Sequence, residues 1–152
     1  MKGTVQASGM AVVLFAVLAL AGCVTSPTEQ SPAGDEPGVP LTNTYWQLVR
    51  VAGEAVPDTG SEQKAHILFL DDGRVSGFSG CNQYMGNYQV RGENLLFDSM
   101  GSTRMACEEN LVEELLFAAL AKTVGVNLDG TELLLLGEAG EELAVFEAAR
   151  LK

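Results

Sequence analysis

Short runs of strand-forming residues, each bounded by turn residues, occupy most of the chain between residues 42 and 149. The runs predict strands at eight places: 45–51, 65–70, 74–78, 84–90, 95–97, 124–128, 132–136 and 143–146. Short segments rich in Gly, Asp and Asn separate them. One of these, Asp71-Asp72-Gly73, predicts a hairpin that closes on a left-handed glycine. The pattern therefore predicts strands that run in short, antiparallel steps.

One segment has a different period. From Glu108 the apolar residues recur every three or four positions, which predicts an amphipathic helix. Its apolar face comprises Leu111, Val112, Leu115, Leu116, Ala119 and Leu120. Acidic residues in the first turns and Lys122 near the end suit the helix dipole, and Gly125 is the expected stop. Glu113 and the other glutamates are expected to form a solvated face.

The order of elements predicts the fold class. Strands, one helix and then more strands give no βαβ alternation, so we expect an antiparallel sheet and an α+β fold. A single apolar helix face can be buried only if the sheet curves around it, as in a barrel-like meander. Trp46 is the expected core anchor. Tyr84 and Tyr88 share one face of their strand, which is either core or an exposed interaction surface, and the pattern leaves both open.

The first 41 residues have a different composition. Lys2 precedes the apolar run 10–20, which leads into Leu20-Ala21-Gly22-Cys23. This is typical of a signal peptide and resembles the lipobox of bacterial lipoproteins, so we predict removal of residues 1–22 and lipid attachment at Cys23. An ordinary signal peptide with an incidental cysteine is the alternative. Residues 24–40 contain four prolines and no aromatic residue, so 23–41 is predicted to be a lipidated linker and 42–149 the folded domain.

Charge and the anchor together predict a location. Val24, rather than aspartate, follows Cys23, so we expect an outer-membrane lipoprotein whose domain faces the periplasm. The formal net charge of −11 argues against nucleic-acid binding and against electrostatic docking on anionic lipids. Contact with the membrane is therefore predicted to be through the covalent anchor.

The three cysteines predict a disulfide. With Cys23 lipidated, Cys81 and Cys107 remain, and in an oxidising envelope they are expected to pair. Two buried, reduced thiols are the competing interpretation. A thiol-dependent enzyme would need a base, and the single histidine, His66, lies in an apolar run. No phosphate loop, dinucleotide fingerprint or metal-binding motif occurs, so we expect neither a cofactor nor a metal, and no enzymatic activity.

Several short motifs then occur in an order that resembles the META domain family. They are Gly80-Cys81-Asn82, Gly86-Asn87-Tyr88, Gly92 with Leu95 and Phe97, Thr103 to Cys107, and Glu113-Glu114 in the predicted helix. Trp46-Gln47-Leu48 is similar to the opening strand of the family, and the resemblance covers residues 42–148. It implies a curved antiparallel sheet with one helix, commonly in an envelope lipoprotein. Bacterial members include heat-shock lipoproteins of the HslJ type, loosely associated with stress and antibiotic tolerance, and the resemblance implies no catalytic residues.

These observations predict a function. We expect a non-enzymatic, outer-membrane-anchored META domain lipoprotein that supports envelope integrity or stress tolerance by binding another protein or a small apolar ligand. One alternative is an inhibitor of an envelope-attacking enzyme such as lysozyme, because an acidic domain suits a basic target. The other is a thiol-dependent envelope enzyme.

Overall fold

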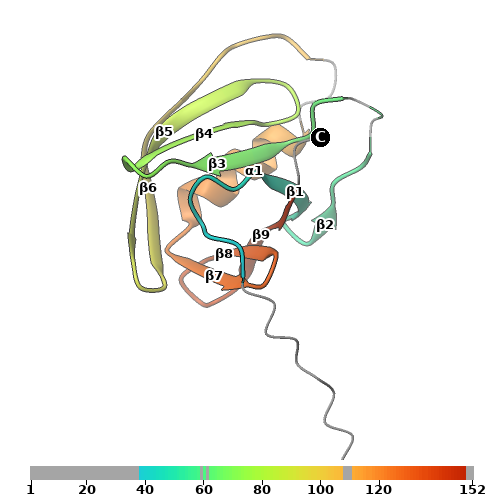
Figure 1. Ribbon diagram of the computed structural model, residues 1–152. Coiled ribbons are helices and arrows are strands. Elements are labelled where there is room, and N and C mark those ends of the chain that lie inside the picture. The colour runs from blue at the N-terminus through green and yellow to red at the C-terminus, as the bar shows by residue number, and fades with distance from the viewer. Residues whose placement is uncertain (1–37, 59, 61, 108–110, 150–152) are drawn as a thin grey trace, which may run out of the picture. The chain divides into compact units, whose positions relative to one another are not determined.

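The computed structural model describes residues 38–58, 60, 62–107 and 111–149. The predicted signal peptide, Cys23 and most of the predicted linker lie outside these residues. Within them, nine strands and one helix follow one another along the chain (Figure 1). They are β1 (Trp46–Val51), β2 (Glu54–Ala55), β3 (His66–Phe69), β4 (Arg74–Phe78), β5 (Gln83–Arg91), β6 (Asn94–Ser102), α1 (Leu111–Lys122), β7 (Gly125–Asp129), β8 (Glu132–Leu136) and β9 (Glu142–Ala148).

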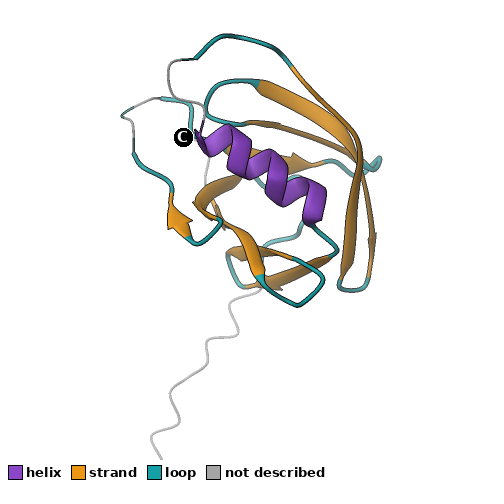
Figure 2. Cartoon of the chain, turned by 180° about the vertical axis from the view of Figure 1, so that it is seen from behind, coloured by secondary structure: helices purple, strands orange, loops and turns teal. Residues whose placement is uncertain are grey.

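The strands form a single antiparallel sheet that curves back on itself. Its order is β2-β1-β3-β4-β5-β6-β7-β8-β9, and β1 also pairs with β9. The curved sheet encloses α1, which crosses its concave side (Figure 2). The predicted α+β class, with a barrel-like sheet around one helix, is confirmed.

Strand pairing in the sheet is shortest where β6 meets β7. These strands share one residue pair, Asn94 with Gly125, and α1 lies between them in the chain. Backbone hydrogen bonds from Leu95 N to Val124 O (3.1 Å) and from Val126 N to Glu93 O (2.8 Å) complete the junction. Beyond it the two strands no longer pair, so this part of the sheet closes through a short contact.

Two β-bulges account for differences between the observed strands and the predicted ones. The register of β1 against β9 shifts between Leu48 and Arg50, so Val51 is buried on the same side as Trp46, which simple alternation does not predict. In β6, Ser99 has a φ of 53° where the register slips against β5. A bulge absorbs one extra residue, so β6 continues to Ser102 rather than ending near residue 97.

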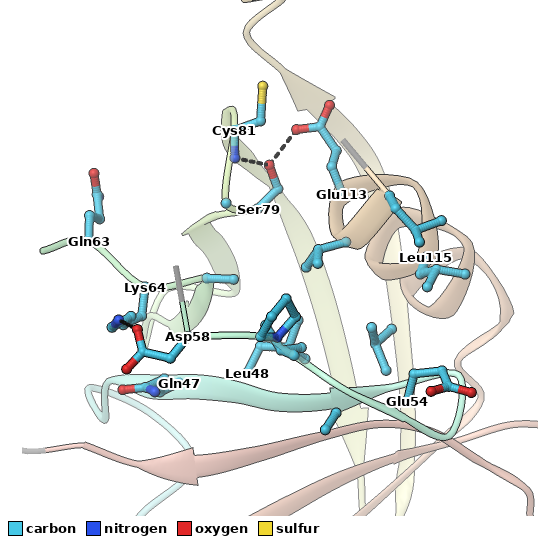
Figure 3. A pocket seen from close by; sticks show the side chains of 18 residues that line it. Gln47, Leu48, Glu54, Asp58, Gln63, Lys64, Ser79, Cys81, Glu113 and Leu115 are labelled. Atoms are coloured by element: carbon cyan, nitrogen blue, oxygen red, sulfur yellow. Dashed lines mark hydrogen bonds and ion pairs between the residues drawn. The ribbon is translucent and has the colours of Figure 1, made fainter. Parts of the chain in front are cut away.

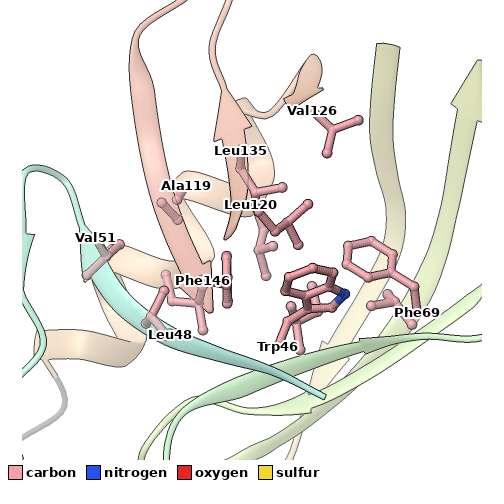
Figure 4. Packing of buried hydrophobic residues seen from close by; sticks show 14 of the residues in the cluster. Trp46, Leu48, Val51, Phe69, Ala119, Leu120, Val126, Leu135 and Phe146 are labelled. Atoms are coloured by element: carbon pink, nitrogen blue, oxygen red, sulfur yellow. The ribbon is translucent and has the colours of Figure 1, made fainter. Parts of the chain in front are cut away.

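The hydrophobic core lies between α1 and the concave face of the sheet (Figure 4). Trp46 is fully buried, which confirms it as the core anchor, and its indole Nε1 donates a hydrogen bond to Leu41 O at 2.9 Å. The helix contributes Leu116, Ala119 and Leu120 to the buried cluster. The predicted apolar face of α1 is therefore only partly buried, because Leu111 at its start is 65% exposed.

Tyr84 and Tyr88 belong to this core, so the interpretation of them as an exposed interaction surface is wrong. Their side chains are 2% and 8% exposed. Their hydroxyls donate to backbone carbonyls of β3 and the turn after it, Tyr84 to His66 O at 2.9 Å and Tyr88 to Leu70 O at 2.8 Å. Tyr84 lies opposite Gly77 of β4, where the Cβ of any larger residue would overlap its ring. Each tyrosine thus buries its ring and satisfies its hydroxyl, as buried tyrosines generally do.

Candidate binding cleft

A cleft of about 560 Å³ opens beside the start of α1 (Figure 3). Four segments line it: the β1–β2 hairpin, residues 56–58 with 63–65, the turn that follows β4, and the first half of α1. Its apolar lining consists of Leu48, Val51, Ala55, Val56, Pro57, Ala65, Leu111, Val112 and Leu115. Its polar lining includes Gln47, Glu54, Asp58, Gln63, Lys64, Ser79 and Glu113.

The cleft exists because the chain leaves the sheet between β2 and β3. Along one edge of β1, Trp46 and Gln47 pair with β3, whereas Arg50 and Val51 pair with β2. The chain connecting β2 to β3 therefore bends away from β1. Hydrogen bonds from Val56 N to Val49 O (2.9 Å) and from Leu48 N to Ala65 O (2.8 Å) hold the two ends of this connection.

An ion pair braces the same connection. The Lys64 ammonium contacts the carboxylate of Asp58, which also accepts a hydrogen bond from Gly60 N at 2.9 Å. The hydrogen bond from Lys64 is the main reason that the pKa of Asp58 lies below its ordinary value. At neutral pH the two charges cancel at this edge of the cleft.

A buried polar network forms the opposite wall. Ser79 Oγ contacts the carboxylate of Glu113, and Asn82 donates to the same carboxylate twice, from its backbone N to Oε2 (3.2 Å) and from Nδ2 to Oε1 (3.1 Å). Ser79 Oγ also accepts a hydrogen bond from Asn82 N at 2.9 Å. The turn after β4 is thereby joined to the first turn of α1.

Asn82 is the centre of this network. Its side chain is 3% exposed, and its Oδ1 accepts hydrogen bonds from Thr103 Oγ1 and from Met105 N, both at 2.8 Å. One amide side chain therefore connects three separate stretches of chain: its own turn, the segment after β6, and α1. Across the described residues, every buried polar side-chain atom has a hydrogen-bond partner.

A disulfide reinforces the same wall. Cys81, which lines the cleft, is bonded to Cys107, with 6.1 Å between their Cα atoms. Asn82 Nδ2 lies 3.2 Å from the Cys81 sulfur. Neither of these cysteines carries a free thiol in this state. The predicted pair is thus present, and it joins the turn after β4 to the chain that leads into α1.

His66, the only candidate base for a thiol enzyme, does not line the cleft. Its ring stacks on Tyr45, with 4.2 Å between the ring centroids, and its Nδ1 lies 2.9 Å from Lys64 O. Burial lowers its pKa below the ordinary value. It acts as a packed aromatic group on the sheet, as its apolar neighbours suggested.

Residues 39–150 match the META domain family. The chain belongs to this family. The resemblance of its cysteine, glycine and asparagine motifs to META domains is therefore confirmed. No curated protein matches the sequence.

Two solved structures share the META-like fold. A protein from Burkholderia xenovorans, determined by NMR, is 31% identical, with a TM-score of 0.57 over 72% of this chain and 85% of that one. A second protein determined by NMR is 22% identical, with a TM-score of 0.58 over 72% of this chain and 95% of that one. The second likeness concerns the fold alone.

In this META domain the structure gives one predicted surface residue a different role. Glu113 was expected on a solvated helix face, but it is half-buried and accepts hydrogen bonds from the turn around Asn82, whereas its neighbour Glu114 is exposed. Helical periodicity alone places Glu113 beside the apolar stripe. Its partner lies 31 residues earlier in the chain, and no local pattern identifies such a partner.

Metal and membrane sites are not apparent in the described part of the META domain. No group of three or more His, Cys, Asp or Glu side chains there is arranged to hold a metal ion. None of the helices in the same residues is long and apolar enough to cross a membrane.

Proposed function

We propose that this META domain is a non-catalytic binding module of the bacterial envelope that takes up a small apolar ligand in the cleft beside α1. We also propose that it is anchored to the outer membrane through a lipid on Cys23, faces the periplasm, and supports envelope integrity or stress tolerance. The single observation that carries the binding role is the cleft itself, about 560 Å³ in volume and lined largely by aliphatic side chains.

The size and lining of the cleft suit such a ligand. Sites for small molecules usually measure about 300–1,000 Å³ and combine apolar walls with a few polar groups. Each methylene of a ligand that leaves water for such a wall contributes about 0.8 kcal/mol. A short acyl chain or an aromatic ring system would therefore gain several kcal/mol here.

The chemistry of the lining supports binding rather than catalysis. Among its described residues the cysteine is held in a disulfide, and the hydroxyl of Ser79 is engaged by Glu113 and Asn82. No histidine lines the cleft. A nucleophile needs a neighbouring base and a free reactive atom, so the thiol-dependent enzyme loses its main support.

A neutral fluorescent probe tests the binding site. We expect N-phenyl-1-naphthylamine to bind the mature chain carrying Cys23→Ser, with increased fluorescence and one saturable site. Ala55→Trp places an indole inside the cleft and should abolish the signal. Ala118→Trp is the matched control, because Ala118 is exposed on α1 outside the lining. An absence of binding to the parent chain, or equal binding by the two tryptophan variants, would refute the proposal.

Cell fractionation tests the anchor separately. Cys23→Ser removes the thiol that would be acylated, so the domain should move from the membrane fraction to the soluble envelope fraction. Retention of the variant in membranes would contradict lipid anchoring at Cys23. Such a result would not bear on ligand binding in the cleft.

A further inference from the structure

The charges around the cleft are unequal. Four of its lining residues ionise: Glu54, Asp58, Lys64 and Glu113. Asp58 and Lys64 pair with one another. This leaves two carboxylates without a cationic partner in the cleft lining, Glu54 from β2 and Glu113 from α1 (Figure 3).

Glu113 takes part in none of the ion pairs of the described residues, although it is well bonded. Its described hydrogen-bond partners, Ser79 and Asn82, are neutral, so they fix the carboxylate in place without cancelling its charge. The start of α1 adds only about half a positive charge, less than one carboxylate carries. Glu54 is exposed and takes part in none of the ion pairs found among the described residues.

An aliphatic wall with acidic groups discriminates between ligands of the same length. The apolar body of any amphiphile gains the same burial against Leu48, Val112 and Leu115. A cationic head in the cleft is attracted by the carboxylates of its lining, Glu54 and the half-buried Glu113. An anionic head meets like charge, and the net charge of −11 further disfavours its approach.

We propose, on the basis of the function proposed above, that the cleft selects small amphiphilic cations: molecules with an acyl or aromatic body and one ammonium or guanidinium group. Anionic amphiphiles of the same length, such as fatty acids, are disfavoured. The ligand is thus a positively charged amphiphile rather than a free acyl chain.

Competition against the neutral probe tests this selectivity. Decylamine, which is cationic at pH 7, 1-decanol and decanoate share one chain length and differ in charge. We expect decylamine to displace the probe at concentrations about tenfold lower than decanoate, with decanol between them, in about 50 mM salt. The difference should shrink at about 500 mM salt, because screening weakens charge interactions and not apolar burial.

Two variants and one control assign the effect to the cleft. Glu54→Gln should weaken the binding of decylamine about threefold and leave the binding of decanol unchanged. The melting temperature should not change, because Glu54 is exposed. Lys64→Gln leaves the Asp58 carboxylate without its cationic partner, so it should strengthen the binding of decylamine about twofold. Glu93→Gln removes an equal charge at the exposed β5–β6 turn, outside the cleft, and should change nothing.

The outcomes separate the two proposals. If the probe binds but decanoate displaces it as well as decylamine does, the selectivity for cations is wrong and the binding cleft stands. If the three variants change the affinity for decylamine equally, the selectivity does not come from the carboxylates of the cleft, and its assignment to Glu54 and Asp58 is overturned. If the probe does not bind the parent chain, both proposals fall together.

Discussion

The core around Trp46 and the turn around Asn82 are buried almost equally but are held by different forces. Trp46 is fully buried among aliphatic and aromatic side chains, and Asn82 is 3% exposed among hydrogen-bonding groups. Packing in the first region is non-directional, so its contribution follows the apolar area removed from water. The second region depends on directional bonds, where losing one partner leaves several others unsatisfied.

The difference teaches where this small domain is tolerant and where it is not. Volume-conserving exchanges in an aliphatic core usually cost little, because neighbouring side chains repack. The buried Asn82 amide bonds the Glu113 carboxylate, the Thr103 hydroxyl and the Met105 backbone, so it has no equivalent replacement. We therefore expect substitutions in the core to destabilise the domain mainly when they remove side-chain volume. Substitutions around Asn82 should destabilise it mainly when they remove a hydrogen-bonding group.

The largest effect is expected from Trp46→Ala. Removing the indole leaves a cavity and frees the Leu41 carbonyl, so we expect a loss of about 4 kcal/mol in the free energy of unfolding. Urea denaturation followed by circular dichroism measures it. Leu96→Ala, at a 53% exposed position, is the control and should cost less than about 0.5 kcal/mol. A loss below about 1 kcal/mol for Trp46→Ala would mean that Trp46 does not anchor the core.

The next effect is expected from removing the disulfide by the double change Cys81→Ala and Cys107→Ala. The bridge joins positions 26 residues apart, and in the chain-entropy model a loop of this length contributes about 3.5 kcal/mol. Denaturation of the oxidised parent, the reduced parent and the double variant measures it. Equal stability of all three would show that the hydrogen bonds of Asn82 hold this wall unaided.

Asn82→Ala is expected to have a smaller but specific effect. It removes the acceptor for Thr103 and Met105 and a donor to Glu113, so we expect a loss of about 2 kcal/mol. Asn87→Ala is the matched control, because Asn87 is exposed and its side-chain amide donates to Asp98 at the surface. If both changes cost the same, the network around Asn82 contributes no more than a surface hydrogen bond.

The smallest effect is a pH dependence from His66. Burial lowers the pKa of the His66 imidazole in the folded state. The imidazole is therefore protonated at a higher pH in the unfolded chain than in the folded chain. The stability associated with neutral His66 is therefore complete above its unfolded pKa of about 6.5 and declines as the pH falls below that value. Asp58 and Asp72 have lowered pKa values, so the stability they contribute is lost only at more acidic pH, as they are protonated.

Melting curves between pH 5 and pH 8 measure this dependence. His66→Gln should flatten the decline between pH 5 and pH 7 while keeping a planar polar side chain beside Tyr45. An unchanged slope in the variant would assign the decline to other groups.

Local sequence patterns predict most of the elements of this domain. Alternation and turn residues place eight of the nine strands, because a strand face and a tight turn depend on neighbouring residues. The two-residue strand β2 escapes detection, since it is too short to show a period. Ser99 and the shift after Leu48 also escape, because a bulge is defined by the register with the partner strand.

The cleft could not be predicted in the same way. Its walls come from β1, the connection between β2 and β3, the turn at Ser79 and α1, which are distant in the chain. The amphipathic pattern of α1 predicts a solvated face for Glu113, and only the fold brings Asn82 and Ser79 against it. Tyr84 and Tyr88 show the same dependence, because alternation groups them on one face and only the curvature of the sheet decides that this face is inside.

Sequence alone thus determined the order of eight strands and the helix, the acidic net charge and the two cysteines available to pair, and the anchor at Cys23 stays a prediction. These properties depend on composition and on interactions between near neighbours. Tertiary structure decided that Tyr84 and Tyr88 are buried, where β6 and β7 join, and which carboxylates line the cleft. The physical reason is that burial and charge proximity depend on residues far apart in the chain, and folding alone brings those together.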